Sequence, residues 1–224
     1  MNLSNLTSFP AMDTLQLMAL AGALGWASGV RLYLVVLLTG LAGFMGWVAL
    51  PQGLHLLQHP LVLGAAGFMV FIEFFADKIP MLDSLWDGLH TFIRIPAGAA
   101  LAASVFGFDS GAWGMAAGLL GGTLAAGSHV TKATTRAAIN TSPEPFSNIG
   151  ASLAEDALVP SMLWLSVAHP VVFFGALALV LVVSVVLLRL CWRFIGLLKS
   201  FVLRFFGGAP SSPPVATAPK ATLP

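Results

Sequence analysis

The chain has 224 residues, of which 58% are hydrophobic and only 8% are charged, and its formal net charge is +1. An ordinary soluble domain carries about 25% charged residues, so this composition excludes a soluble globular protein and indicates an all-α integral membrane protein. The single cysteine, Cys191, excludes an internal disulfide and a cysteine-based zinc site. We expect no cofactor and no nucleic-acid partner.

The N-terminal segment, residues 1–12, is polar but has no Lys or Arg, so it lacks the cationic region of a cleavable signal peptide. The first apolar runs, residues 15–27 and 30–47, are separated by Ser28-Gly29, and Arg31 follows at once. Either one long helix kinks here or two pieces meet inside the membrane. Both arrangements require protein or water to satisfy the freed backbone groups.

The middle of the chain contains shorter apolar segments that are interrupted by charge and proline. Residues 61–76 end at the break 77–80, and residues 85–106 contain the kinking Pro96. Residues 112–126 are rich in Gly and Ala, which permits close helix contact, and residues 147–168 form a further segment. We expect about six to eight membrane segments, some broken or re-entrant, within a membrane domain that covers residues 13–188.

The last apolar run, residues 171–188, has no charge over 18 residues and is long enough to cross a hydrocarbon core of about 30 Å. Residues 189–206 combine aromatic side chains with four basic ones, which predicts a basic amphipathic helix at the membrane surface. The positive-inside rule then places the C-terminus in the cytoplasm. Residues 207–224 are rich in Pro and Ala, so we expect a disordered tail.

A weak internal echo links residues 15–80 with residues 112–165. The echo consists of Gly22, Leu24, Ser28 and Val30, which recur 100 positions later as Gly122, Leu124, Ser128 and Val130. Duplication and chance similarity account for it equally well, because Gly/Ala-rich membrane sequence repeats easily. A true duplication would favour inverted repeats whose broken helices meet at the membrane midplane.

Eleven of the nineteen charged residues fall in two stretches, residues 73–94 and 132–156. A charge inside hydrocarbon costs about 2.5–3.5 kcal/mol on insertion scales, so intramembrane charges usually face a protein interior or a wet cavity and mark function. Helical spacing arranges the polar residues in three stripes. The stripes are Asp83, Asp87, His90 and Arg94, then His129, Lys132 and Arg136, then Asn148 and Ser152 with Glu155 or Asp156. Further candidates for the ion or substrate pathway are Arg31, Glu73, Asp77 and Lys78.

These charges allow two interpretations. In the first, a buried ion-pair network fixes helix register, although desolvation makes such networks weak stabilisers. That network would pair Arg31, Lys132 and Arg136 with Glu73, Asp77, Glu155 and Asp156. In the second, buried carboxylates and a histidine relay protons or couple cations, while the basic groups hold an anionic substrate or exchange carboxylate partners.

The same residues resemble a known family. Ser28-Gly29-Val30-Arg31, Glu73 with Asp77-Lys78-Ile79-Pro80, the stripe from His129 to Arg136, and Ser152 with Glu155-Asp156 are similar to the bacterial membrane family catalogued as domain of unknown function 4126. The resemblance covers about residues 15–170. It implies a multi-pass protein of the bacterial inner membrane and supplies no substrate or reaction.

Three hypotheses follow, of which a channel or secondary transporter for a small ion or anionic solute is the leading one. The second is an enzyme acting on a lipid headgroup, with Asp83, Asp87 and His90 holding a metal and with Lys132 and Arg136 binding phosphate. The third is a noncatalytic membrane scaffold that binds partners through its basic helix and tail. The sequence favours a protein that is not an enzyme, whose partners are the lipid bilayer and the solute, and it is compatible with a homo-oligomer.

Overall fold

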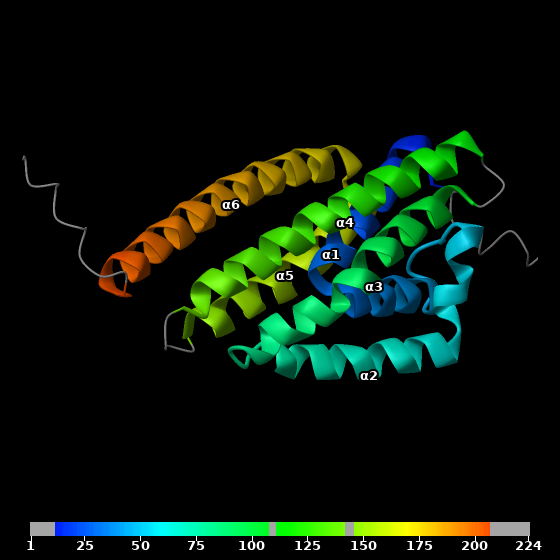
Figure 1. Cartoon of the computed structure of the whole chain (residues 1–224). Helices are drawn as coiled ribbons and strands as arrows, with labels where there is room; N and C mark the ends of the chain where they lie inside the picture. Colours follow the sequence, from blue (N-terminus) through cyan, green and yellow to red (C-terminus); the bar gives the residue numbers. More distant parts are fainter. Residues whose placement is uncertain (1–11, 108–110, 142–145, 207–224) are drawn as a thin grey trace, which may run out of the picture.

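The computed structural model describes residues 12–107, 111–141 and 146–206. These residues form six α-helices and one 3₁₀ helix, without a strand in the described ranges, which confirms the all-α class (Figure 1). The elements are α1 (Thr14–Phe44), the 3₁₀ helix η2 (Gln52–Gln58), α2 (Pro60–Ala76), α3 (Leu82–Phe106), α4 (Ala112–Ile139), α5 (Phe146–Ala168) and α6 (Pro170–Phe206). The predicted N-terminal segment, apart from Met12, and the predicted tail lie outside the described residues.

Local sequence signals set several helix boundaries. A capping box precedes α1, in which Asp13 accepts a hydrogen bond from the Gln16 backbone N–H at 2.7 Å and the Gln16 side chain accepts one in return at 3.0 Å. Pro60 begins α2, where a missing N–H costs nothing. The turn between α2 and α3 contains Met81 at φ 70°, a backbone conformation that prevents the two helices from merging.

Helix α1 folds back on itself at Arg31, whose backbone is non-helical at φ −146° and ψ 80°. Leu20 and Ala42 would lie about 33 Å apart on a straight helix, yet both line one apolar pocket of about 480 Å³. The first limb, residues 14–30, and the second limb, residues 32–44, therefore run back towards the same end of the molecule (Figure 1). Of the two arrangements expected near Ser28-Gly29, the chain adopts the kinked helix. The kink is so sharp that the two limbs form a hairpin with Arg31 at its apex.

The first limb of α1 packs against α3 and α4 through small residues. A Cβ atom at Gly25 would lie 2.5 Å from the Cα of Gly121, and one at Gly98 would lie 2.6 Å from the Cβ of Ala125. The three backbones can approach this closely only because these positions carry no larger side chain. The contact therefore joins α1, α3 and α4 tightly along the first limb.

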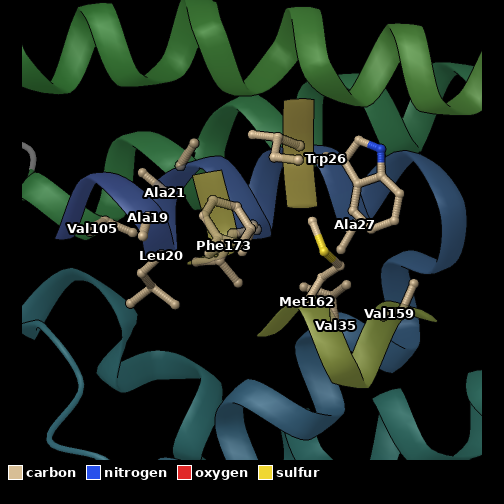
Figure 2. Close-up of a cluster of buried hydrophobic side chains, with 14 of the residues drawn as sticks. Ala19, Leu20, Ala21, Trp26, Ala27, Val35, Val105, Val159, Met162 and Phe173 are labelled. Atoms are coloured by element: carbon tan, nitrogen blue, oxygen red, sulfur yellow. The ribbon is translucent and has the colours of Figure 1, made fainter. Parts of the chain in front are cut away.

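The hydrophobic core lies between the limbs of α1 and the helices α5 and α6. Figure 2 shows Val35 of the second limb beside Val159 and Met162 of α5, with Phe173 of α6 against the first limb. The Phe173 ring packs against the first limb at Gly22, where a Cβ would lie at an ordinary contact distance of 3.4 Å from it. The apolar core thus holds the two limbs of the hairpin in place.

Three helices in the described residues are long and apolar enough to cross a membrane, namely Thr14–Phe44, Leu82–Phe106 and Pro170–Leu197. The pair formed by η2 and α2, bent by 67°, would supply a fourth. Although α1 qualifies by length and composition, its fold-back returns both limbs to one end. The chain is thus a membrane protein, while the larger number of six to eight membrane segments stays a prediction.

The internal repeat also stays a prediction. The first limb of α1 and α4, which carry the two copies of the echo, lie against each other at Gly25 and Gly121. Their conformations differ beyond the echo, because α1 turns back at Arg31 whereas α4 continues as one helix to Ile139.

The glycine contact leads to a matched pair of substitutions. Gly25→Ala should lower the free energy of unfolding by about 1–3 kcal/mol, because the added methyl group meets the backbone of α4. Gly127→Ala, on α4 with no atom within 4 Å of its Cβ position, should be neutral or stabilising by up to about 1 kcal/mol. Thermal unfolding of both variants in detergent would measure the difference. Equal stabilities would show that the contact is not tight.

Candidate functional site

Ten charged side chains of the described residues form one continuous set of ion pairs, which we call the charge network. Its cations are Arg31, Lys78, Arg94, Lys132 and Arg136, and its anions are Glu73, Asp77, Asp87, Glu155 and Asp156. Each of the ten was a candidate from the sequence. The structure brings them together from the apex of α1, the end of α2, the turn after it, and helices α3, α4 and α5.

Accessibility changes along the charge network. The side chains of Glu155, Lys78 and Asp156 are 17%, 19% and 24% exposed, whereas the other seven are at most 2% exposed. We call the first three the accessible end. The pair of Glu73 and Arg94 forms the buried end, which is connected to the accessible end only through other charged groups.

At the buried end, Arg94 uses both terminal nitrogens. Its Nη2 contacts Glu73 Oε1 at 2.6 Å and its Nη1 contacts Asp87 Oδ1 at 2.7 Å. His129 adjoins this group, since its Nδ1 lies 3.5 Å from Arg94 Nη1 and its Nε2 lies 2.8 Å from the hydroxyl of Thr91. An arginine that bridges two carboxylates in this way forms two charge-assisted hydrogen bonds, which are stronger than bonds between neutral groups.

Lys132 joins the buried end to the rest of the charge network. Its Nζ lies 2.7 Å from Asp77, 3.3 Å from Glu155 and 3.6 Å from Asp87. The same ammonium donates to the Val30 carbonyl at 3.2 Å, immediately before the apex of α1. One cation therefore contacts three carboxylates from three different parts of the chain.

Arg31 occupies a similar position and joins Asp77 to the accessible end. Its Nη2 lies 3.1 Å from Asp77 Oδ2 and 3.0 Å from Asp156 Oδ1, and it donates to the hydroxyl of Ser152 at 2.9 Å. Lys78 reaches the same region, with its Nζ 3.4 Å from Asp156 Oδ2 and 3.2 Å from the Phe74 ring centroid. The fold-back of α1 is what delivers Arg31 to these groups.

Arg136 contacts mainly neutral groups. Its Nη1 donates to the Asp77 carbonyl at 3.2 Å, to the Asn148 carbonyl at 2.8 Å and to the Asn148 side chain. Its Nη2 lies 3.0 Å from Glu155. Arg136 therefore fastens the end of α2 to the first turns of α5.

Several buried atoms of the charge network have hydrogen-bonding capacity that no described residue uses. They include the second carboxylate oxygens of Glu73, Asp77 and Asp87, and the Nε of Arg94. Nearly all buried polar atoms in proteins are paired with protein or with water. These atoms are therefore the places where a proton, a water molecule or a small ion would find a partner.

Two sequence candidates lie apart from the charge network. Asp83 accepts hydrogen bonds from the Asn140 side chain at 2.8 Å and from the Ser84 backbone at 2.6 Å. His90 contacts the Trp86 carbonyl at 2.8 Å and the Tyr33 hydroxyl at 3.0 Å. No group of three or more metal-ligating side chains converges in the described part of the chain. The three ligands that the metal-enzyme hypothesis requires, Asp83, Asp87 and His90, each have different partners.

Sequence reasoning did not identify Tyr33, Thr91 or Asn140 as partners of the candidate residues. Tyr33 is the only tyrosine in the chain and lies two residues after Arg31, which was an available signal. Thr91 follows Asp87 by one helical turn and donates to its carbonyl at 3.0 Å. Asn140 gave no signal, because its partner is 57 residues away.

Comparison with known proteins finds one family. A family model described as "Domain of unknown function (DUF4126)" matches residues 18–190, which is most of the chain. No curated protein and no solved structure matches. The resemblance inferred from the sequence motifs is thereby confirmed, and the match includes every residue of the charge network.

Removal of Arg94 should lower the free energy of unfolding, because its two acidic partners are buried. Arg94→Met should destabilise the protein by about 3–5 kcal/mol, because Glu73 would remain buried without a cation and Asp87 would keep only Lys132, at 3.6 Å. The triple variant with Glu73→Gln and Asp87→Asn should recover most of that loss. Chemical unfolding in detergent would measure all three proteins.

The control is Arg193→Met, which removes a cation from an exposed position on α6 and should change stability by less than about 0.5 kcal/mol. A triple variant that is no more stable than Arg94→Met would show that the charges of Glu73 and Asp87 are not what Arg94 compensates.

Proposed function

The chain belongs to the DUF4126 family, and from its charge network we propose that it is a transport protein that moves a small ion or anionic solute across the membrane. The observation that carries this proposal is the gradient of accessibility, from three partly exposed groups to a fully buried pair. Intramembrane charges are rare and typically line the pathways of transported ions and protons.

The depth of the charge network suits this function. Arg94 is twelve residues from the start of α3 at Leu82, which corresponds to about 18 Å along a helix. A hydrocarbon core is about 30 Å thick, so in a spanning α3 the Arg94 guanidinium lies beyond the midplane or close to it. A substrate that followed the network would pass through roughly half of the membrane.

The packing in the other half of the membrane, beyond the buried end of the charge network, favours a carrier over an open channel. There the first limb of α1 lies against α3 and α4 through Gly25, Gly98 and Gly121, without room for an additional methyl group. A channel requires a continuous path, whereas a carrier closes one side while the other is open. In this proposal the described conformation is open only at the accessible end.

The accessible end faces the cytoplasm in this proposal. The turn between α2 and α3 lies at the same end of the molecule as the C-terminal part of α6 (Figure 1). That part of α6 carries Arg189, Arg193, Lys199 and Arg204. The positive-inside rule assigns such a segment to the cytoplasmic side, consistent with a bacterial inner membrane.

Exchange of ion-pair partners supplies the mechanism. Lys132 contacts three carboxylates and Arg31 contacts Asp77 and Asp156 at similar distances, so either cation can change partner with small movements. Protonation of one carboxylate would release its cation to an anionic solute. Loss of that proton would restore the original pair and expel the solute, which couples the two movements.

Flux measurements test the transport function. Proteoliposomes that contain Glu73→Gln, Asp77→Asn or Lys132→Ala should show at least about tenfold lower flux of protons and ions under imposed pH and salt gradients than the wild type. Arg193→Gln, outside the charge network, should keep wild-type flux. Size-exclusion chromatography must show that each protein is folded. Full flux in all three network variants, or none in the wild type, would refute the proposal.

Thiol labelling tests the direction in which the charge network opens. In a Cys191→Ser background, Lys78→Cys should react with a membrane-impermeant reagent in inside-out vesicles but not in intact cells, because its side chain is partly exposed at the accessible end. Ser28→Cys, at a fully buried position of the first limb, should stay unreactive in both. Reaction of Lys78→Cys in intact cells would reverse the proposed orientation.

A further inference from the structure

Asp156 lies between two cations at the accessible end. Its Oδ1 is 3.0 Å from Arg31 Nη2 and its Oδ2 is 3.4 Å from Lys78 Nζ. Both cations also contact the Ser152 hydroxyl, at 2.9 Å and 3.2 Å respectively. We call Arg31, Lys78 and Ser152 the cradle, because these three side chains surround one carboxylate.

The cradle has the donor set of an oxyanion-binding site. A guanidinium, an ammonium and a hydroxyl are the groups that bind phosphate, sulfate and carboxylate through charge-assisted hydrogen bonds. The carboxylate that fills the cradle belongs to the chain itself. Asp156 is four residues after Ser152 on α5, so one helical turn places its side chain over the cradle.

The cradle does not depend on Asp156 for its shape. Arg31 remains paired with Asp77 at 3.1 Å, and Asp77 is fully buried. Lys78 remains held by the Phe74 carbonyl and by the Phe74 ring, each at 3.2 Å. Departure of Asp156 would therefore leave two positioned cations and a hydroxyl.

Among the acids of the charge network, Asp156 is the one best placed to leave. Its side chain is the most exposed of the five, at 24%. Asp77 and Asp87 are buried, and Glu155 contacts both Lys132 and Arg136. Without Asp156 the network would hold five cations and four anions, so one bound monoanion would restore its neutrality.

The geometry points to an oxyanion-binding site in the cradle that Asp156 occupies as an internal competitor. The ligand is a small phosphate-like oxyanion, which binds when the Asp156 carboxylate moves out. This inference rests on the proposed transport function in one respect, because it names the substrate class of that same site. Binding at equilibrium tests it without any transport.

Binding to purified full-length protein provides the test, with inorganic phosphate and sulfate as the probes. Asp156→Asn keeps the side-chain shape and removes the competing charge, so it should bind both anions at least tenfold more tightly than the wild type in calorimetry. The double variant Asp156→Asn/Lys78→Gln should lose that gain. Asp83→Asn is the matched control, because it removes an acid that has no ion pair within the described residues, and it should bind like the wild type.

Two results would overturn the inference, namely equal affinity of Asp156→Asn and the wild type, or an equal gain in Asp83→Asn. If Asp156→Asn does not fold, Asp156→Ser takes its place, and Lys78→Gln should also weaken the low-affinity binding of the wild type. Tighter anion binding by Asp156→Asn without flux in the wild type would support the oxyanion site and refute transport. Flux in the wild type without tighter binding by Asp156→Asn would support transport and refute the oxyanion site.

A parallel titration separates two sources of the same phosphate chemistry. Short-chain phosphatidylglycerol, soluble below its micellar concentration, presents a lipid phosphate to the same proteins. Tighter binding of inorganic phosphate by Asp156→Asn supports a free oxyanion as the ligand. A gain confined to phosphatidylglycerol would overturn the free-solute assignment and give the cradle to a lipid headgroup.

Discussion

The requirement that every buried charge has a partner governs this structure. Arg31 lies at the apex of a helical hairpin, where the backbone is non-helical and the guanidinium is almost fully buried. Such a group is tolerated because Asp77 stays paired with it at 3.1 Å, while Asp156 approaches it from a third part of the chain. These ion pairs connect the hairpin to the end of α2 and to α5, so the positions of the three elements depend on one another.

The close packing of α1 on α4 serves the same requirement. A break in a helix frees backbone groups that hydrocarbon cannot satisfy. Here Lys132 donates to the Val30 carbonyl at 3.2 Å and Ser128 donates to the Trp26 carbonyl at 2.6 Å, both from α4. These bonds can form because Gly25 allows the two helices to touch. The apolar contact and the polar contacts along α4 are therefore parts of one arrangement.

Sequence reasoning identified the charged residues of the site, and its first interpretation paired Arg31, Lys132 and Arg136 with Asp77, Glu155 and Asp156 as the structure does, but it gave Glu73 the wrong cations. Helical spacing correctly placed Asp87 and Arg94 on one face of α3, yet Asp83 and His90 of the same stripe have other partners. Periodicity shows which face a residue occupies, not which helix lies opposite, so the pairing of Arg94 with Glu73 was not predicted. The break at Ser28-Gly29 was recognised, but its outcome depended on Asp77 and Asp156, which lie 46 or more residues away. The number of membrane segments could not be settled from apolar length, because α1 folds back.

The equal numbers of cations and anions in the charge network also constrain how the family can evolve. A substitution that removes one charge leaves the network with one uncompensated charge, whereas a second substitution that removes an opposite charge restores the balance. Sequence change at Arg94, Glu73 and Asp87 should therefore occur as correlated replacements, with single losses purged by selection. Asp156 and Lys78 are partly exposed to solvent and escape much of this penalty. Among related chains, single substitutions should accordingly concentrate at the accessible end, whereas substitutions at the buried end should occur together.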